Sequence, residues 1–273
     1  MFKLFIDSFK KTNRSIILTI PLIAFILIAE IYYSGTKSLE LNLGQTLLSI
    51  ATIIIVLSAF MACWFYMAKK VLKYSDKIFV FEEDRGSAFR EVLLSFPKGF
   101  GKFFLPFLGF ILIYILFFYL LHISANFFIS RNVGGINFGL FNIGLLLNPL
   151  ELHSKLLNLS SGGDIAFSYW ICSMGIGISI ASFLTILWIP EIIYTKKDIL
   201  TSLFNSIKKI IITLPKTFIL YFSIQLIIIF SSILTVICMD NIYLYFLAIL
   251  FYYYLFIYII VLLYTYYEET FLK

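Results

Sequence analysis

The chain has 273 residues, of which 61% are hydrophobic and only 13% charged, and its formal net charge is +6. Its mean hydropathy is +0.99. Soluble domains carry about 25% charged residues, so this balance excludes an ordinary soluble core. The positive residues flank hydrophobic stretches. We therefore assign them to membrane orientation and to contact with anionic lipid headgroups, and we expect no nucleic-acid partner.

Six hydrophobic stretches follow one another along the chain, each long enough for a helix to cross a bilayer core of about 30 Å. Helices satisfy their own backbone hydrogen bonds in hydrocarbon, and the alternation typical of membrane strands is absent from the sequence. The sequence thus predicts an all-α membrane protein with six transmembrane helices arranged as three hairpins. The predicted spans are residues 15–33, 46–68, 103–129, 166–194, 217–239 and 243–266. We expect the first span to be retained, because no small-residue cleavage site follows the basic start.

Basic residues alternate between the two sides of these spans. The N-terminal arm, the second and fourth connections and the C-terminal tail hold four, eight, five and one of the 21 Lys and Arg residues. The other three connections hold only three between them. Because basic residues collect on the cytoplasmic side, both chain ends are predicted to be cytoplasmic. The abundance of Phe (31) and Tyr (18) is typical of an AT-rich genome, so we expect a bacterial cytoplasmic (inner) membrane.

A short amphipathic helix is predicted ahead of spans one, three and five, where apolar residues recur at spacings of three and four. These segments are residues 2–14, 87–98 and 199–211. We expect each to lie in the cytoplasmic interface, with its apolar face among the acyl chains. Asp198 is the predicted N-cap of the third segment.

The three helix-plus-hairpin units favour an internally repeated, pseudo-symmetric bundle within a single membrane domain, residues 1–273. The repeats would be residues 1–75, 76–196 and 197–273. The alternative is that basic amphipathic segments commonly precede spans, and that the short match between the first and third segments arose by chance. Residues 131–165 form a long outer loop whose apolar middle is too short to span, which predicts an interfacial or re-entrant segment.

The residue types that bind metals are scattered. Cys63, Cys172 and Cys238 lie within or at the end of predicted spans and have no metal-like spacing, so we expect them to pack as small apolar residues. His122 and His153 have no Cys, Asp or Glu at ligand spacing. We therefore predict neither a metal nor a cofactor.

Uncharged polar residues provide the candidate binding site. On span five they share one helical stripe, and on span six two tyrosines lie four residues apart. These candidates are Tyr221, Gln225, Ser232, Tyr254 and Tyr258. One interpretation is a packed bundle interior with hydrogen bonds between helices, each worth about 0.6 kcal/mol. The other is a polar-lined cavity for an amphiphile, with Gln225 and Tyr254 as its first lining residues.

Three acidic residues lie at span ends: Glu30, Glu191 and Asp240. We expect each to reach water or headgroups, since a charge at the bilayer centre costs about 2.5–3.5 kcal/mol. No charge lies near the middle of a predicted span. This argues against a proton-coupled pump with a buried carboxylate and against a catalytic cluster inside the membrane.

The segment 188–194, with sequence WIPEIIY, is followed by the basic helix 198–209. Together with the basic amphipathic start and the helix before span three, it resembles the uncharacterised six-span bacterial inner-membrane family typified by YciC. It is also similar to the membrane domain fused to some glycerophosphodiester phosphodiesterases. The resemblance implies this architecture and a lipid-related role, and it carries over no catalytic residue.

These patterns lead to a multi-pass membrane protein that is not an enzyme: a transport or channel-like component, or a membrane scaffold, with lipids as partners. The alternative is an integral-membrane lipid-modifying enzyme. A second copy of the chain or another membrane subunit is a further expected partner.

Overall fold

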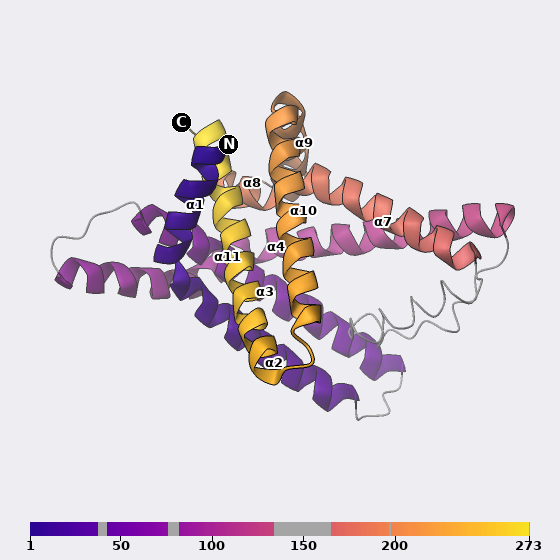
Figure 1. Cartoon of the computed structure of the whole chain (residues 1–273), viewed down its shortest axis with the longest axis horizontal. Helices are drawn as coiled ribbons and strands as arrows, with labels where there is room; N and C mark the ends of the chain where they lie inside the picture. Colours follow the sequence, from indigo (N-terminus) through magenta and orange to yellow (C-terminus); the bar gives the residue numbers. More distant parts are fainter. Residues whose placement is uncertain (38–42, 76–81, 134–164, 197, 273) are drawn as a thin grey trace. The chain divides into compact units, whose positions relative to one another are not determined.

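A computed structural model describes residues 1–37, 43–75, 82–133, 165–196 and 198–272. The regular structure of this part is helical (Figure 1). The helices are α1 (Phe2–Arg14), the short 3-10 helix η1 (Ile16–Leu18), α2 (Thr19–Lys37), α3 (Leu43–Ser75), α4 (Glu82–Asn132), α7 (Ile165–Thr185), α8 (Trp188–Thr195), α9 (Ile199–Ile212), α10 (Leu214–Ile237) and α11 (Ile242–Phe271). Six helical segments are long and apolar enough to cross a membrane, and each overlaps one predicted span. The prediction of an all-α, six-span membrane protein is confirmed.

Two element boundaries differ from the predicted ones. The amphipathic segment 87–98 is not a separate helix but the first part of α4, which continues through Pro97 and Pro106. The predicted span 166–194 is divided at residues 186–187 into α7 and α8. Pro190 explains this division, because a proline cannot donate to the carbonyl four residues before it, here that of Ile186.

The chain packs into two compact units. The first combines Met1–Ile111 with Leu184–Lys273, and the second is Leu112–Phe183. The predicted three-fold repeat stays a prediction. Of the predicted outer loop, residues 134–164 lie outside the described residues.

In the first unit, α1 packs along α11 (Figure 1). The Tyr258 hydroxyl donates to the carbonyl of Phe5 at 3.4 Å, and the Tyr254 hydroxyl donates to Asn13 Oδ1 at 2.6 Å. The Phe9 ring lies edge-on to both tyrosine rings. Because residues that advance along α1 meet residues that recede along α11, the two helices are antiparallel.

Trp64 fixes α3 at the core of the same unit. Its side chain is 1% exposed, and its indole Nε1 donates to the carbonyl of Leu18 at 3.0 Å. The Tyr264 hydroxyl of α11 donates to the carbonyl of Phe65 at 3.2 Å. Nearly every residue of α11 from 257 to 267 is buried, so this end of α11 forms the centre of the unit.

The second unit pairs the C-terminal part of α4 with α7. Ala125, Ile129 and Ala166 are buried together, and Trp170 and Met174 pack against them. A Cβ on Gly177 would lie 2.6 Å from the Leu121 side chain, so the glycine allows the two helices to approach closely.

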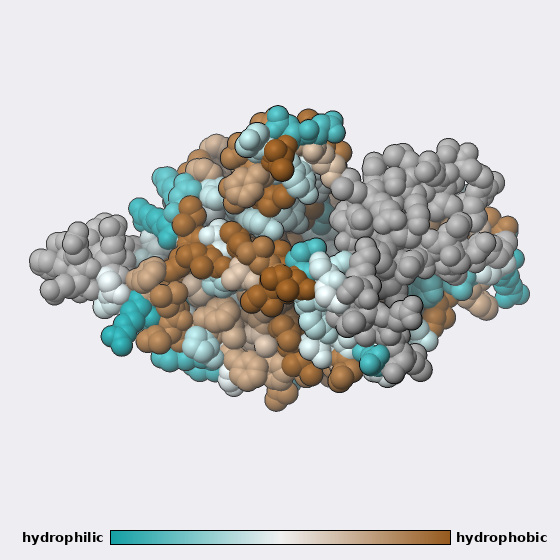
Figure 2. All heavy atoms as spheres, turned by 90° about the horizontal axis from the view of Figure 1, so that it is seen from below, coloured by the Kyte–Doolittle hydropathy of each residue, from teal (hydrophilic) through white to brown (hydrophobic). Residues whose placement is uncertain are grey.

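Much of the apolar surface is exposed. On α10, for example, Phe218, Phe222 and Phe230 are each more than half exposed. Figure 2 shows hydrophobic residues over much of the visible face. Six apolar helices with such surfaces support a multi-pass membrane protein. Extended apolar surface is unfavourable in water, whereas the acyl chains of a bilayer can solvate it.

Gly99 generates the first testable prediction. A Cβ at this position would lie 2.5 Å from the backbone oxygen of Ala62 and 2.8 Å from the α-carbon of Cys63, so α3 and α4 touch backbone to backbone there. We expect Gly99→Ala to lower the free energy of unfolding by about 1–3 kcal/mol through overpacking. The measurement is thermal or denaturant unfolding of the purified chain in detergent.

The matched control for Gly99→Ala is Gly101→Ala on the same helix, where an added Cβ meets nothing within 4 Å. Alanine favours helix over glycine by about 0.8–1.0 kcal/mol, so the control should be neutral or stabilising. Equal stability of the two variants would contradict the close approach of α3 and α4.

Candidate functional site

The candidate site begins with the reversal between α8 and α9. Lys196, at φ 54°, adopts the left-handed conformation that ends α8. Asp198 is the N-cap residue of α9, as predicted, and its carboxylate accepts from the Thr201 hydroxyl at 2.5 Å. Trp188 Nε1 donates to the carbonyl of Ile199 at 3.2 Å and joins the two helices. The reversal brings the side chain of Lys209 back to α8.

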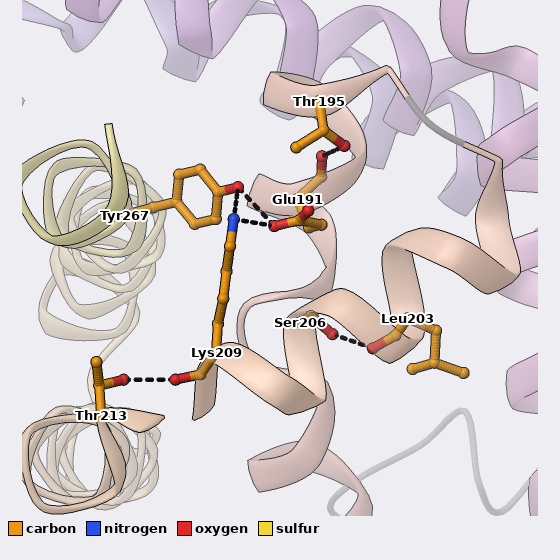
Figure 3. A network of polar contacts seen from close by, with 7 residues as sticks. All are labelled: Glu191, Thr195, Leu203, Ser206, Lys209, Thr213 and Tyr267. Atoms are coloured by element: carbon orange, nitrogen blue, oxygen red, sulfur yellow. Dashed lines mark hydrogen bonds and ion pairs between the residues drawn. The ribbon is translucent and has the colours of Figure 1, made fainter. Parts of the chain in front are cut away.

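Three charged or hydroxyl groups from three helices meet at this point (Figure 3). Lys209 Nζ of α9 lies 2.6 Å from Glu191 Oε2 of α8, and the Tyr267 hydroxyl of α11 donates to the same oxygen at 2.5 Å. Lys209 Nζ also donates to the Tyr267 hydroxyl oxygen at 2.6 Å. We call Glu191, Lys209 and Tyr267 the polar triad.

The polar triad is enclosed by protein. The Glu191 side chain is 1% exposed and that of Lys209 is 23% exposed. Lys209 Nζ lies 4.5 Å from the Tyr267 ring centroid and 5.0 Å from that of Phe271, distances at which a cation is attracted to an aromatic face. The ammonium group is therefore held by a carboxylate, a hydroxyl and two rings.

Hydroxyl groups beside the triad bond to the helix backbone. The Thr195 hydroxyl donates to the carbonyl of Glu191, and the Thr213 hydroxyl donates to the carbonyl of Lys209, both at 2.8 Å (Figure 3). The Thr217 hydroxyl lies 2.9 Å from the Thr213 hydroxyl and 2.9 Å from the Tyr266 hydroxyl, and so extends the polar contacts to α10. Four helices thus share one connected polar region.

An aromatic layer covers one side of the triad. Tyr194 stacks on Tyr267 with ring centroids 5.3 Å apart and meets Tyr264 edge-on at 5.7 Å. The Tyr194 hydroxyl donates to Glu268 Oε1 at 2.5 Å. Lys69 Nζ lies 4.2 Å from the Tyr194 ring centroid, so a second cation borders this layer.

This arrangement is suited to joining helices. A carboxylate buried in an apolar setting is tolerated only when it is paired and hydrogen-bonded, and both conditions hold for Glu191. Its partners come from α9 and α11, so the pairing fixes the relative position of three helix ends. A substrate could not reach the carboxylate unless these helices moved apart.

The three acidic residues predicted at span ends differ in their exposure. Glu30 and Asp240 are exposed, and their access to water or headgroups stays a prediction. The expectation that Glu191 reaches water or headgroups is wrong, because α9 folds over it and supplies the ammonium group of Lys209.

The predicted cavity residues lie on two helices, Tyr254 and Tyr258 on α11 and Tyr221, Gln225 and Ser232 on α10. Tyr254 and Tyr258 come together around Phe9 of α1. On α10, Tyr221 and Gln225 are half-buried, and Ser232 is exposed with its hydroxyl bonded to the carbonyl of Ile228. A cavity shared by these five residues stays a prediction.

Sequence reasoning missed Lys209 and Tyr267 as partners of Glu191. One signal was present: Glu191 lies in the strongly apolar run 186–193, where a carboxylate needs a nearby cation. Lys209 belongs to the first basic helix after that run, where basic residues also signal membrane orientation. Tyr267, 76 residues away along the chain, gave no comparable signal.

Comparison with known proteins gives no family for this chain. No protein-family model matches it, and no curated protein and no solved structure matches it. The assignment of function therefore depends on the residues and their geometry.

The pairing within the polar triad can be tested by the unfolding stability of variants of Glu191 and Lys209. Lys209→Met leaves the Glu191 carboxylate buried without its cation, and we expect a loss of about 3–5 kcal/mol in the free energy of unfolding. The double variant Glu191→Gln/Lys209→Met removes both charges and should recover part of that loss. The measurement is unfolding of each variant in the same detergent, read as a double-mutant cycle.

The matched control is Lys208→Met, one residue away and exposed, which should change stability by no more than about 0.5 kcal/mol. A Lys209→Met variant as stable as this control would show that the ion pair does not hold the three helix ends together.

Proposed function

We propose that this protein is a non-enzymatic component of the bacterial cytoplasmic membrane: a lipid-contacting scaffold, or the membrane part of a transport assembly. The observation that carries the proposal is the internal pairing of the polar triad. Glu191, the one predicted acid that is buried, is bonded to Lys209 and Tyr267 and is closed off from solvent. A catalytic carboxylate needs access to its substrate, whereas a structural one needs only its partners.

The exposed apolar surface supports the same proposal. Along α10, Thr217, Leu220, Ile224 and Ser231 are buried, and most of the other residues are exposed or half-buried. A surface of this kind must be covered by lipid, by a second copy of the chain or by another membrane subunit. The segment 188–194 agrees with membership of the YciC-type family, in which a lipid-related role is expected.

We further propose that both chain ends lie in the cytoplasm, on the basis of the alternation of basic residues. In this orientation α1 and α9 lie on the cytoplasmic side, and the turn at Asp240 lies outside. The polar triad then belongs to the cytoplasmic ends of its helices.

Cysteine labelling tests the orientation. Cys63, Cys172 and Cys238 are first replaced by alanine, and Lys208→Cys and Asp240→Cys are then made separately, because both positions are exposed. A membrane-impermeant maleimide added to intact spheroplasts should label the Asp240→Cys variant. It should label the Lys208→Cys variant only after the membrane is opened.

Lys10→Cys, which is exposed on α1, is the control for the inner side and should behave as Lys208→Cys does. Labelling of Lys208→Cys from outside, with Asp240→Cys protected, would reverse the proposed topology.

Lipid mass spectrometry tests the choice between scaffold and enzyme. The full chain in nanodiscs of phosphatidylglycerol and phosphatidylethanolamine should leave both lipids chemically unchanged. Gentle extraction from the native membrane should recover the chain with a second copy or with another membrane subunit. A lipid conversion that is lost in Glu191→Gln but kept in Glu30→Gln would replace the scaffold proposal with the enzyme.

A further inference from the structure

Three lysines of the first unit flank the predicted ends of three different spans. Lys69 directly follows the predicted span two, Lys102 directly precedes span three, and Lys196 follows span four after one residue. Lys102 and Lys196 line a half-open pocket of about 190 Å³, together with Phe103 and Pro106. Lys69 Nζ lies 4.2 Å from the ring centroid of Tyr194, two residues before Lys196.

Two of these ammonium groups have fixed surroundings. Lys69 Nζ donates to the carbonyl of Ile193 at 3.0 Å, and Lys102 Nζ lies 3.5 Å from the Tyr66 hydroxyl oxygen. Lys102 Nζ is also 5.3 Å from the Tyr66 ring centroid. Lys69 and Lys102 are therefore held in place by contacts with neutral groups, which do not cancel their charge.

Among the described residues, few acidic groups lie near these three lysines. In the part of the chain that the structure describes, Lys69, Lys102 and Lys196 form no ion pair. Glu268 is the carboxylate that attracts Lys69, and Lys70 adds a further positive charge nearby. Like charges so gathered repel one another, and an anion bound between them would relieve the repulsion.

The pocket has the size and the surroundings of a headgroup site. Its volume is below the roughly 300 Å³ at which pockets for whole small ligands begin, so it fits one phosphate group rather than a complete ligand. Its lining includes Phe103 and Pro106, where the predicted span three begins, and the neighbouring Leu105 is 74% exposed. An acyl chain attached to the bound phosphate could follow this apolar surface.

We propose that Lys69, Lys102 and Lys196 bind the phosphate group of an anionic membrane lipid. Lysine binds phosphate as a point charge through charge-assisted hydrogen bonds, and basic pockets between membrane helices are suited to lipid headgroups. The three lysines flank the predicted ends of spans two, three and four, and span ends are where lipid headgroups are expected. This inference rests on the proposed membrane orientation, which the cysteine labelling tests separately.

The experiment is native mass spectrometry of the full chain in detergent, titrated with phosphatidylglycerol or with zwitterionic phosphatidylcholine. We expect the wild type to retain one phosphatidylglycerol with an apparent Kd at least about tenfold lower than that for phosphatidylcholine. The double variant Lys102→Gln/Lys196→Gln should lose this preference, and Lys102→Arg/Lys196→Arg should keep most of it.

The matched control is Lys10→Gln/Lys208→Gln, which removes the same charge from two exposed lysines on α1 and α9. It should retain the lipid preference of the wild type. Equal losses in the two Gln variants would overturn the proposal, because general surface charge would then explain the binding.

Two soluble competitors distinguish the source of the phosphate. Inorganic phosphate and glycerol phosphate should each fail to displace phosphatidylglycerol at concentrations about a hundredfold above the lipid. Displacement by either one would overturn the lipid assignment in favour of a soluble phosphate. Unchanged lipid preference in the Lys102→Gln/Lys196→Gln variant, with correct cysteine labelling, would overturn this site alone and leave the proposed orientation intact.

Discussion

The burial of one carboxylate determines the arrangement of α8, α9 and α11. Glu191 is 1% exposed, and a charge in such a place must be paired where it lies. Its cation comes from α9, a helix of 14 residues that would be marginal in water without tertiary contacts. Its hydroxyl partner comes from the most buried part of α11. The position of α9 therefore follows from the need to neutralise Glu191.

The parts of the fold that depend on local pattern could be predicted from the sequence. Long apolar runs specify the six spans, and spacings of three and four specify α1 and α9, because burial in lipid and amphipathicity both act within a single segment. The continuity of α4 through Pro97 and the break before Pro190 could not be predicted in the same way. Both prolines disfavour a helix interior, and their neighbours decide whether the helix continues.

The candidate site was harder to predict than the fold because its partners are distant along the chain. A tyrosine is suited both to a cavity wall and to a helix contact, and Tyr254 and Tyr258 use their hydroxyls to hold α1. An acid at a span end can face water or another helix, and nothing local shows that Lys209 returns to Glu191. The sequence indicates that a buried Glu191 needs a cation, but it does not indicate which one. The pairing with Lys209 depends on the reversal of the chain at Lys196.

A count of basic residues does not distinguish lysines that only set the membrane orientation from lysines that also make specific contacts. Lys69, Lys102, Lys196 and Lys209 all contribute to the excess of basic residues from which orientation is inferred. Orientation requires only that they lie on one side, yet Lys209 is paired with a buried carboxylate. Lys102 and Lys196 line a pocket, and within the described residues neither they nor Lys69 form an ion pair. Lys209 neutralises a buried carboxylate, whereas the three other lysines are the ones that we propose for binding a lipid phosphate. This contrast between a paired internal charge and lysines without ion pairs supports the proposed role of a membrane component that contacts lipid.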